Sequence, residues 1–372
     1  MDDENQADPP ERWLPPEFEV QSEAEEPPAD EPPGRRTPTV ALAVWLLLLF
    51  VCGVGGIALQ LQELAALVAL AGLFIAAQAA DVDPQWFLLN RVLSVVVPVG
   101  GCASFAMLAV FVYQGEGTPA LRFAGSAFCA AAALFAILTA WPAVARRLTR
   151  LLFRASGDSF TLQLAARLVA LTLLVSIPGV LVFERLMDPL LQTPGMLTGS
   201  RALGGELLGY LLLALAGVGF LVRRDALQTL ERLGIRRVPP RDLGLVVLGA
   251  AALFALNSGT EWIQKMVFPA LWAHDRHVNE ALVMGLSTSQ AMLLGVTAGV
   301  GEELTMRGAL QPRLGLWLTS ALFAALHVQY SWFGMLVVML IGAVLGLLRQ
   351  RSGTTVCIAV HALYDVVAVL TT

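Results

Sequence analysis

Long uncharged runs dominate the pattern of hydrophobic and polar positions along the chain. The first run, residues 37–62, has no Asp, Glu, Lys or Arg, and a helix that crosses a bilayer needs about 20 apolar residues. A last run begins at Thr354. The other uncharged runs lie at 64–80, 92–115, 123–145, 168–183, 207–222, 243–260, 281–301 and 314–348.

The run at 314–348 is long enough for two helices, with Tyr330-Ser331-Trp332 as the turn between them. Counted in this way, the pattern predicts about 11 membrane spans. Composition agrees, because 56% of the 372 residues are hydrophobic and 14% are charged, whereas soluble domains have about 25% charged residues. We therefore predict an all-α, polytopic transmembrane helix bundle.

Residues 1–37 differ from the rest of the chain. They are rich in paired prolines and in Asp and Glu. Such a segment buries too little apolar surface to offset its chain entropy, so we expect a disordered, acidic, Pro-rich tail. The tail could bind a protein partner, although a solvated tail is the simpler interpretation. The acidic balance there argues against a nucleic-acid partner.

Basic residues concentrate in three predicted loops, at 146–158, at 223–242 and around Arg349. Loops rich in Lys and Arg lie on the cytoplasmic side of a membrane. With 11 spans, this bias predicts a cytoplasmic N-terminus in a multi-pass protein of the inner or plasma membrane. Pro239-Pro240 separates an N-terminal membrane region of unknown role, 38–240, from a C-terminal region, 241–372.

Ionisable residues inside the predicted spans concentrate in the C-terminal region. Such residues are costly in a bilayer and indicate function. Pairs four residues apart share one face of a helix, and the helix rise places the acidic and imidazole groups at one depth. The residues are Glu302, Glu303 and Arg307, then Phe323 and His327, then His361 and Asp365.

These side chains suggest hydrolysis. A carboxylate with an imidazole can deprotonate a water, and a second imidazole can stabilise a developing oxyanion. Ser320 and Cys357 stay open as nucleophiles. We expect no cofactor, although two histidines and several carboxylates could bind a divalent metal. The chain has no H-E-x-x-H zinc motif.

The three motifs, in this order, resemble those of the CAAX-protease and bacteriocin-processing family (CPBP or Abi) of intramembrane endopeptidases. The motifs span about 70 residues, and the family's helical core would extend back to about residue 241. The resemblance implies an intramembrane endopeptidase of the glutamate type. It implies that Glu302 activates the water and that His327 assists.

The resemblance also implies roles for the other motif residues. Glu303 and Arg307 would form a structural ion pair, and His361 with Asp365 would form the oxyanion side of the site. The best-studied members have Asn where this chain has Asp365, and an ionised Asp cannot donate a hydrogen bond. For Phe323, simple packing explains the residue equally well.

Two alternatives use the same residues differently. In a proton-coupled transporter, the buried carboxylates and histidines would relay protons. In a membrane adaptor, the cluster would only position helices. The sequence does not identify a substrate: a peptide or a membrane protein, lipidated for some family members, would meet the site within the lipid bilayer.

Two further patterns have structural interpretations. Residues 274–277, His-Asp-Arg-His, are predicted to form a solvated external loop rather than a metal site. Gly342 and Gly346 form a G-x-x-x-G pair, which predicts close helix packing. The four cysteines lie in apolar runs and are expected to pack as small hydrophobic side chains.

Overall fold

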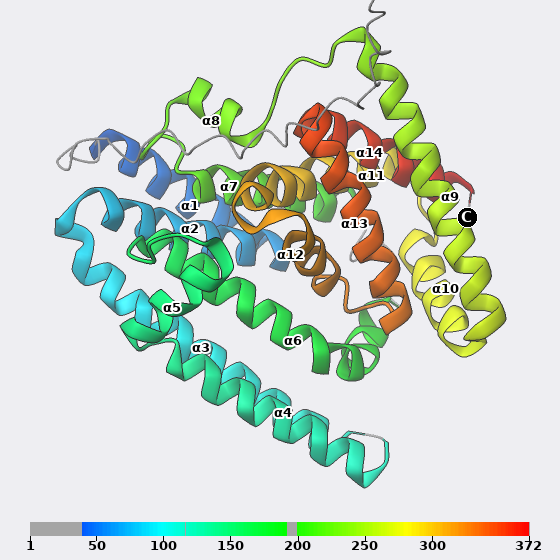
Figure 1. The fold of residues 1–372 in the computed structure, drawn as a ribbon, viewed down its shortest axis with the longest axis horizontal. Helices are drawn as coiled ribbons and strands as arrows, with labels where there is room; N and C mark the ends of the chain where they lie inside the picture. Colours follow the sequence, from blue (N-terminus) through cyan, green and yellow to red (C-terminus); the bar gives the residue numbers. More distant parts are fainter. Residues whose placement is uncertain (1–38, 116, 192–198, 372) are drawn as a thin grey trace, which may run out of the picture. The chain divides into compact units, whose positions relative to one another are not determined.

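The computed structural model describes residues 39–115, 117–191 and 199–371, and its regular elements in these ranges are helices (Figure 1). Within the described ranges, nine helices are long and apolar enough to cross a membrane, or up to ten if a bent pair counts as one span. The chain is thus a multi-pass integral membrane protein. The predicted tail, 1–37, lies outside the described residues.

The N-terminal membrane region contains six long helices and two short ones. The short helices carry several arginines and the long ones are mostly apolar. A Thr or Pro begins several of them, as expected at helix starts. The helices are α1 Thr39–Ala58, α2 Gln62–Val82, α3 Phe87–Tyr113, α4 Pro119–Leu138, α5 Pro142–Phe153, α6 Phe160–Leu191, α7 Ser200–Val218 and α8 Ala226–Leu233.

The C-terminal region contains the other helices and a π-helical segment, η3. In this part of the structure, the predicted run 314–348 does form two helices with the turn between them, which confirms that prediction. The elements are α9 Leu243–Val267, α10 Pro269–Val283, α11 Thr288–Glu303, η3 Leu304–Leu310, α12 Gln311–Ala325, α13 Trp332–Ser352 and α14 Thr354–Thr371.

The span count differs from the sequence estimate because α11, η3 and α12 are continuous. Thr288–Ala325 and α10 form the bent pair, with an angle of 113° between them. Inside α12, Gly315 has φ 74° and ψ 175°, which is not helical. Glycine adopts this conformation without a Cβ penalty, so the chain can redirect there and leave only a short helical piece before Ala325.

Two glycines bring α11 and α14 into backbone contact. A Cβ on Gly299 would lie 2.8 Å from the amide nitrogen of Ala362 and 2.9 Å from the carbonyl oxygen of Ile358. A Cβ on Gly295 would lie 2.8 Å from the Ala362 carbonyl oxygen. The two helices approach this closely because neither glycine has a side chain, and the approach places the end of α11 against the middle of α14.

The G-x-x-x-G pair packs α13 closely on α12, as predicted. A Cβ on Gly342 would lie 3.4 Å from the Cα of Ser320, and one on Gly346 would meet the side chain of Leu316. The buried Gly346 carbonyl accepts a hydrogen bond of 2.8 Å from the Gln311 side-chain amide. Small residues therefore allow polar side chains of the preceding helix to reach the α13 backbone.

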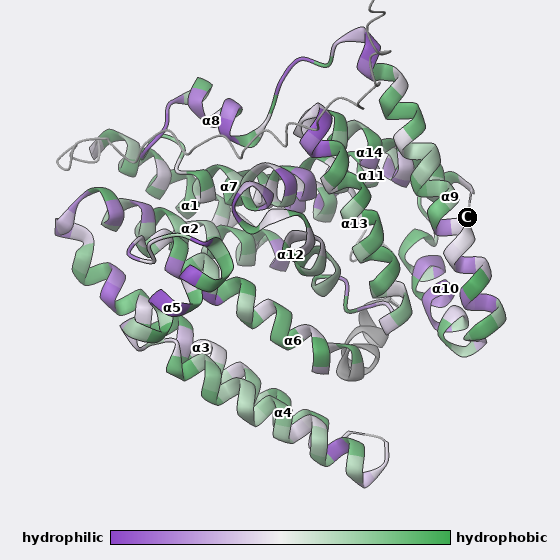
Figure 2. Ribbon diagram, in the orientation of Figure 1, coloured by the Kyte–Doolittle hydropathy of each residue, from purple (hydrophilic) through white to green (hydrophobic). Residues whose placement is uncertain are grey.

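Hydrophobic side chains follow the long helices, and hydrophilic residues gather on α8 and on the segment that leads to α9 (Figure 2). Large apolar side chains such as Phe50, Leu88 and Leu248 are exposed, as expected for surfaces that face lipid. Of the cysteines, Cys129 and Cys357 are buried, whereas the other two are only partly buried.

A buried carboxylate connects α2 with the start of α6. Asp81 accepts hydrogen bonds from the amides of Phe160 (2.6 Å) and Thr161 (3.1 Å) and from the hydroxyl of Ser159 (2.7 Å). Arg223 pairs with the same carboxylate at 2.9 Å. An acid at a helix N-terminus satisfies amides that have no partner within the helix, so Asp81 fixes where α6 begins.

Candidate active site

Glu303 and Arg307 form a buried ion pair at the junction of α11 and η3. Their closest atoms, Oε1 and Nη1, are 3.1 Å apart, and the side chains are 0% and 1% exposed. Arg307 also donates to the Gly342 carbonyl at 3.1 Å and lies 4.6 Å from the Phe323 ring centroid. The predicted contact is confirmed, and it ties η3 to α12 and α13.

His361 on α14 lies among three carboxylates. Its Nδ1 is 2.9 Å from Oε1 of Glu303. Because a carboxylate paired with arginine only accepts hydrogen bonds, Nδ1 is the donor. On the other side of the ring, Nε2 is 3.4 Å from Asp365 and 4.0 Å from Glu302. One imidazole thus links the α11 acids to the acid on its own helix.

The three carboxylates differ in exposure. Glu303 is completely buried, whereas the side chains of Glu302 and Asp365 are 17% and 21% exposed. A water or a substrate can therefore reach Glu302 and Asp365 but not Glu303. The arrangement separates a structural acid, which holds Arg307 and His361, from two accessible acids.

The structure corrects the predicted place of His327. It lies two residues beyond the end of α12 at Ala325, in the connection to α13, rather than on the helix. Its Nδ1 is 2.8 Å from the carbonyl oxygen of Phe323. A carbonyl only accepts, so Nδ1 carries the hydrogen and Nε2 of the neutral ring keeps a lone pair that can accept a proton.

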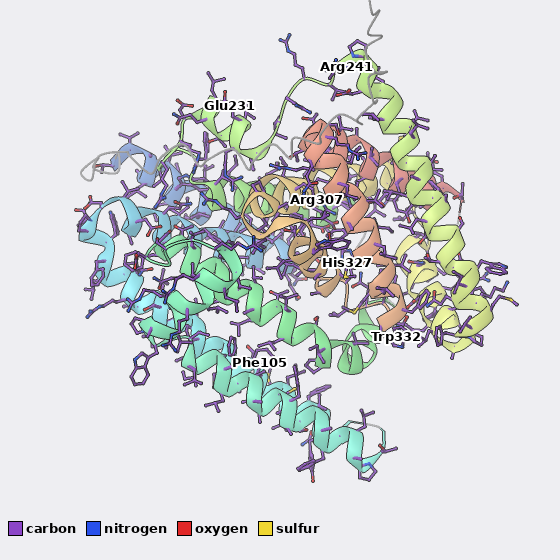
Figure 3. The ribbon with its side chains drawn as sticks, viewed as in Figure 1. Phe105, Glu231, Arg241, Arg307, His327 and Trp332 are labelled. Atoms are coloured by element: carbon purple, nitrogen blue, oxygen red, sulfur yellow. The ribbon has the colours of Figure 1, made fainter. Side chains whose placement is uncertain are left out.

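Phe323 lies between the two imidazoles. Its ring centroid is 4.8 Å from that of His327 and 6.1 Å from that of His361. Arg307 and His327 are labelled in Figure 3, near α12 and α13. The structure therefore brings all seven predicted residues into one connected group from α11, η3, α14 and the end of α12.

Sequence reasoning missed Tyr330, which it treated only as a turn residue. The Tyr330 and His327 rings are parallel within 9°, with centroids 6.4 Å apart. Tyr330 also interacts electrostatically with Asp365 and Glu302. Tyr330 therefore joins the connection that carries His327 to the electrostatic surroundings of the accessible acids. The signal in the sequence was a tyrosine three residues after the histidine, which spacing alone does not interpret.

The N-terminal region also reaches the site, through α7. A Cβ on Gly301, next to Glu302, would lie 2.9 Å from the Tyr210 ring. Tyr210 and Glu206 on α7 both interact electrostatically with Glu302. Nothing in their spacing relates them to the three motifs, so only the fold identifies them as neighbours.

The two candidate nucleophiles are engaged elsewhere. The Ser320 hydroxyl donates to the Leu316 carbonyl at 2.9 Å, and the Cys357 thiol donates to the Leu345 carbonyl at 3.2 Å. Among the described residues, no group of three or more His, Cys, Asp or Glu side chains is arranged to hold a metal ion. The geometry thus favours a water as the nucleophile over either side chain.

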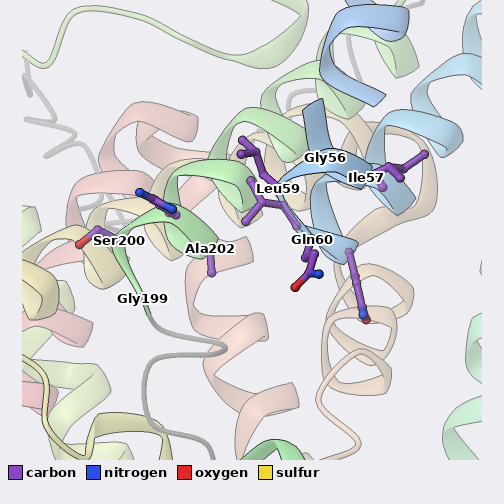
Figure 4. Close-up of a pocket in the computed structure, with 11 residues that line it drawn as sticks. Gly56, Ile57, Leu59, Gln60, Gly199, Ser200 and Ala202 are labelled. Carbon is purple, nitrogen blue, oxygen red and sulfur yellow. The ribbon is translucent and has the colours of Figure 1, made fainter. Parts of the chain in front are cut away.

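A separate cavity of about 860 Å³ lies between the end of α1 and the start of α7 (Figure 4). The cavity is lined by residues around the turn between α1 and α2, among them Gly56, Leu59 and Gln62, and by Gly199, Ser200, Arg201 and Ala202. The candidate site residues are not among those that line it, so the cavity carries no argument about the chemistry.

Comparison with known proteins finds a family model that matches part of the chain. The family model "Type II CAAX prenyl endopeptidase Rce1-like" matches residues 284–367, which include all seven predicted site residues. The uncharacterized protein YpbD of Bacillus subtilis (strain 168) is 27% identical over 160 residues, which are 42% of this chain and 82% of that protein. No solved structure matches the chain.

Proposed function

We propose that this chain, which carries a domain of the Rce1-like type II CAAX prenyl endopeptidase family, is an intramembrane endopeptidase. The observation that carries the proposal is the convergence of Glu302, Glu303 and Asp365 on His361 within an apolar helix bundle. Buried ionisable groups of this kind are costly in a membrane and are retained for function.

In the proposed reaction, a water attacks the carbonyl carbon of a peptide bond. The accessible carboxylate of Glu302 takes a proton from this water, and Nε2 of His327 assists as a second acceptor. Attack produces a tetrahedral oxyanion, which collapses to a carboxylic acid product when the C–N bond breaks and the proton held by Glu302 passes to the leaving amine. A hydrogen on Nε2 of His361 can be donated to this oxyanion, while Nδ1–H stays on Glu303 and fixes the ring.

Asp365 has the least direct role in this scheme. Its oxygen lies 3.4 Å from Nε2 of His361, so as a carboxylate it would accept the Nε2–H before attack, and the oxyanion would take over this hydrogen bond as it forms. We propose that Asp365 orients His361. In that case Asp365→Asn should keep part of the turnover, because the amide oxygen can still accept.

The proposed substrate is a peptide or a membrane protein cut within or beside the bilayer. The family description supplies the first probe, a fluorogenic peptide that ends in a farnesylated CAAX sequence. A comparison of membrane-peptide termini between cells with the wild-type chain and cells with Glu302→Ala would identify other substrates.

The decisive experiment replaces Glu302 with Gln in the full chain in liposomes and measures cleavage of the farnesylated peptide. Loss of a general base lowers turnover by about 10²- to 10⁴-fold. Glu261→Gln is the matched control, because Glu261 is an exposed acid of the same region whose carboxylate accepts a hydrogen bond of 3.1 Å from Trp272. Its turnover should equal that of the wild type.

Three results would contradict the proposal in different ways. Full turnover in Glu302→Gln would remove Glu302 as the base. Substrate uptake into proteoliposomes that survives the same substitution would favour a transporter. Turnover that a chelator abolishes and Zn²⁺ restores would assign the cluster to metal chemistry instead.

A further inference from the structure

The segment 274–277 is not the solvated loop that its composition suggested. It belongs to the helix α10, and Asp275 is only 6% exposed. The Asp275 carboxylate accepts three hydrogen bonds: from the Ser331 amide (2.6 Å), from the Ser331 hydroxyl (2.7 Å) and from the Gln264 side-chain amide (2.7 Å). A buried acid with this many donors is held in one position.

Two neighbouring α10 residues contact the same short segment. The Nε2–H of His274 donates to the Gln329 carbonyl at 3.1 Å, and the Tyr330 hydroxyl donates to the Asn279 side-chain oxygen at 2.8 Å. Together with the bonds from Ser331, α10 therefore contacts three consecutive residues of the connection between α12 and α13. This connection, 326–331, carries His327.

The other end of the connection is fixed by the end of α12, since His327 itself donates to the Phe323 carbonyl. Tyr330, which α10 holds by its hydroxyl, stacks on the His327 ring. The position of the imidazole is thus determined from both sides.

We propose that α10 is a clamp that positions His327, with Asp275 as its main positioning residue. This inference rests on the proposed function, because it gives α10 a part in orienting one member of the site. Displacement of a reacting group by about 1 Å can lower a rate by about 10²-fold.

The start of α13 is built around this acid. The Ser331 hydroxyl accepts the Gly334 amide at 3.2 Å, while it donates to Asp275. A Cβ on Gly334 would lie 2.6 Å from Oδ2 of Asp275, so only glycine leaves room for the carboxylate. The negative charge lies at a helix N-terminus, where the helix dipole favours it.

Gln264 and α10 lie outside residues 284–367, the part that matches the family model. The clamp therefore joins an element beyond the matched segment to a residue inside it. This placement distinguishes the clamp from the motif residues, all of which lie within the match.

Two measurements on the purified full chain in liposomes test the clamp. The hydrogen-exchange rate of the amides of 326–331 measures how firmly the connection is held. The rate of cleavage of the farnesylated CAAX peptide measures the activity of the site. Asp275→Ala should raise exchange in 326–331 at least 10-fold and lower kcat by 10- to 100-fold, with KM within about two-fold of the wild type. Asp81→Ala is the matched control, since it removes a comparable buried carboxylate from the α6 N-terminus.

A conservative variant separates positioning from folding. Asp275→Asn keeps Oδ1, which accepts the Ser331 amide. Its kcat should therefore be at least ten-fold higher than that of Asp275→Ala. In a His327→Ala background, Asp275→Ala should lower the remaining turnover by less than two-fold, because both changes act through the same imidazole.

The possible outcomes distinguish the clamp from the proposed function. Unchanged exchange in 326–331 overturns the clamp, as does a kcat equal to that of Asp81→Ala despite faster exchange. Full loss of kcat from Asp275→Ala in the His327→Ala background also overturns it. Retained cleavage in Glu302→Gln overturns the proposed function instead, whatever Asp275 does.

Discussion

Asp81 and Asp275 show the same structural device in two regions of the molecule. Each is a buried carboxylate that accepts an amide and a serine hydroxyl at the start of another helix, α6 for Asp81 and α13 for Asp275. The two acids differ in what else they connect to. Asp81 also pairs with Arg223, whereas the serine bonded to Asp275 ends the connection that carries His327.

The charges around Asp81 also differ from those around His361 in the candidate site. In the N-terminal region, the buried Asp81 has a cationic partner, and the Arg167 guanidinium donates to the Thr139 carbonyl at 3.1 Å. Around His361, three carboxylates share one imidazole, and Glu303 also pairs with Arg307. Asp81 therefore has a cation beside it, whereas the group around His361 contains more acids than cations.

The largest effect that sharpens this comparison is expected for Arg307→Ala. Glu303 would be left buried without its cation, and breaking a buried pair costs about 3–5 kcal/mol of stability. Thermal unfolding in detergent would measure the loss. Adding Glu303→Gln should recover part of it, because the unpaired charge is then gone. A loss below about 1 kcal/mol would show that the pair is not needed for folding.

Gly299→Ala is expected to have a smaller effect that reaches turnover. Its Cβ would meet α14 backbone atoms at 2.8 and 2.9 Å, and backbone cannot rotate away. Overpacking of this kind costs about 1–3 kcal/mol, and α14 would move with His361 and Asp365. We expect about ten-fold lower cleavage per folded molecule. Wild-type cleavage would mean that the site tolerates a wider gap between α11 and α14.

Asp81→Ala should lower stability without changing turnover. Loss of the hydrogen bonds at the α6 N-terminus costs about 1–2 kcal/mol, as for other N-terminal capping residues. Unfolding and peptide cleavage measured on the same preparation would separate the two properties. A reduced kcat in folded protein would contradict the distinction between Asp81 and Asp275, because it would show that the N-terminal acid also affects the chemistry.

The smallest effect is expected for Gly259→Ala on α9. No atom lies within 4 Å of the added Cβ, and alanine favours a helix interior over glycine by about 0.5–1 kcal/mol. Stability should therefore rise slightly, with cleavage unchanged. If this variant lost activity like Gly299→Ala, then glycine content of the helices, rather than contact with α14, would explain both results.

Much of this structure follows from the sequence by simple physical rules. Uncharged runs long enough to cross a bilayer became helices, since backbone groups in lipid must bond within the segment. Four-residue spacing placed Glu303 with Arg307, and His361 with Asp365, because such pairs share a helix face.

The features that were missed depend on neighbours far along the chain. The polarity of 274–277 suggested solvent, but the donors of Ser331 and Gln264 make the burial of Asp275 favourable. His327 was placed on a helix because it lies in the long uncharged run 314–348. The helix instead ends at Ala325, and His327 lies in a connection held by the Phe323 carbonyl and by side chains of α10.

The π-helical segment Leu304–Leu310 makes the site depend on the number of residues as well as on their kinds. A π-turn holds an extra residue compared with an α-turn. Because the wider turn absorbs this residue, deleting one residue between 304 and 310 would allow an ordinary α-helix there while α11 and α12 keep nearly the same relative orientation. The contacts displaced would be those made from inside the segment, by Arg307 to the Gly342 carbonyl and to the Phe323 ring, with every motif residue still present.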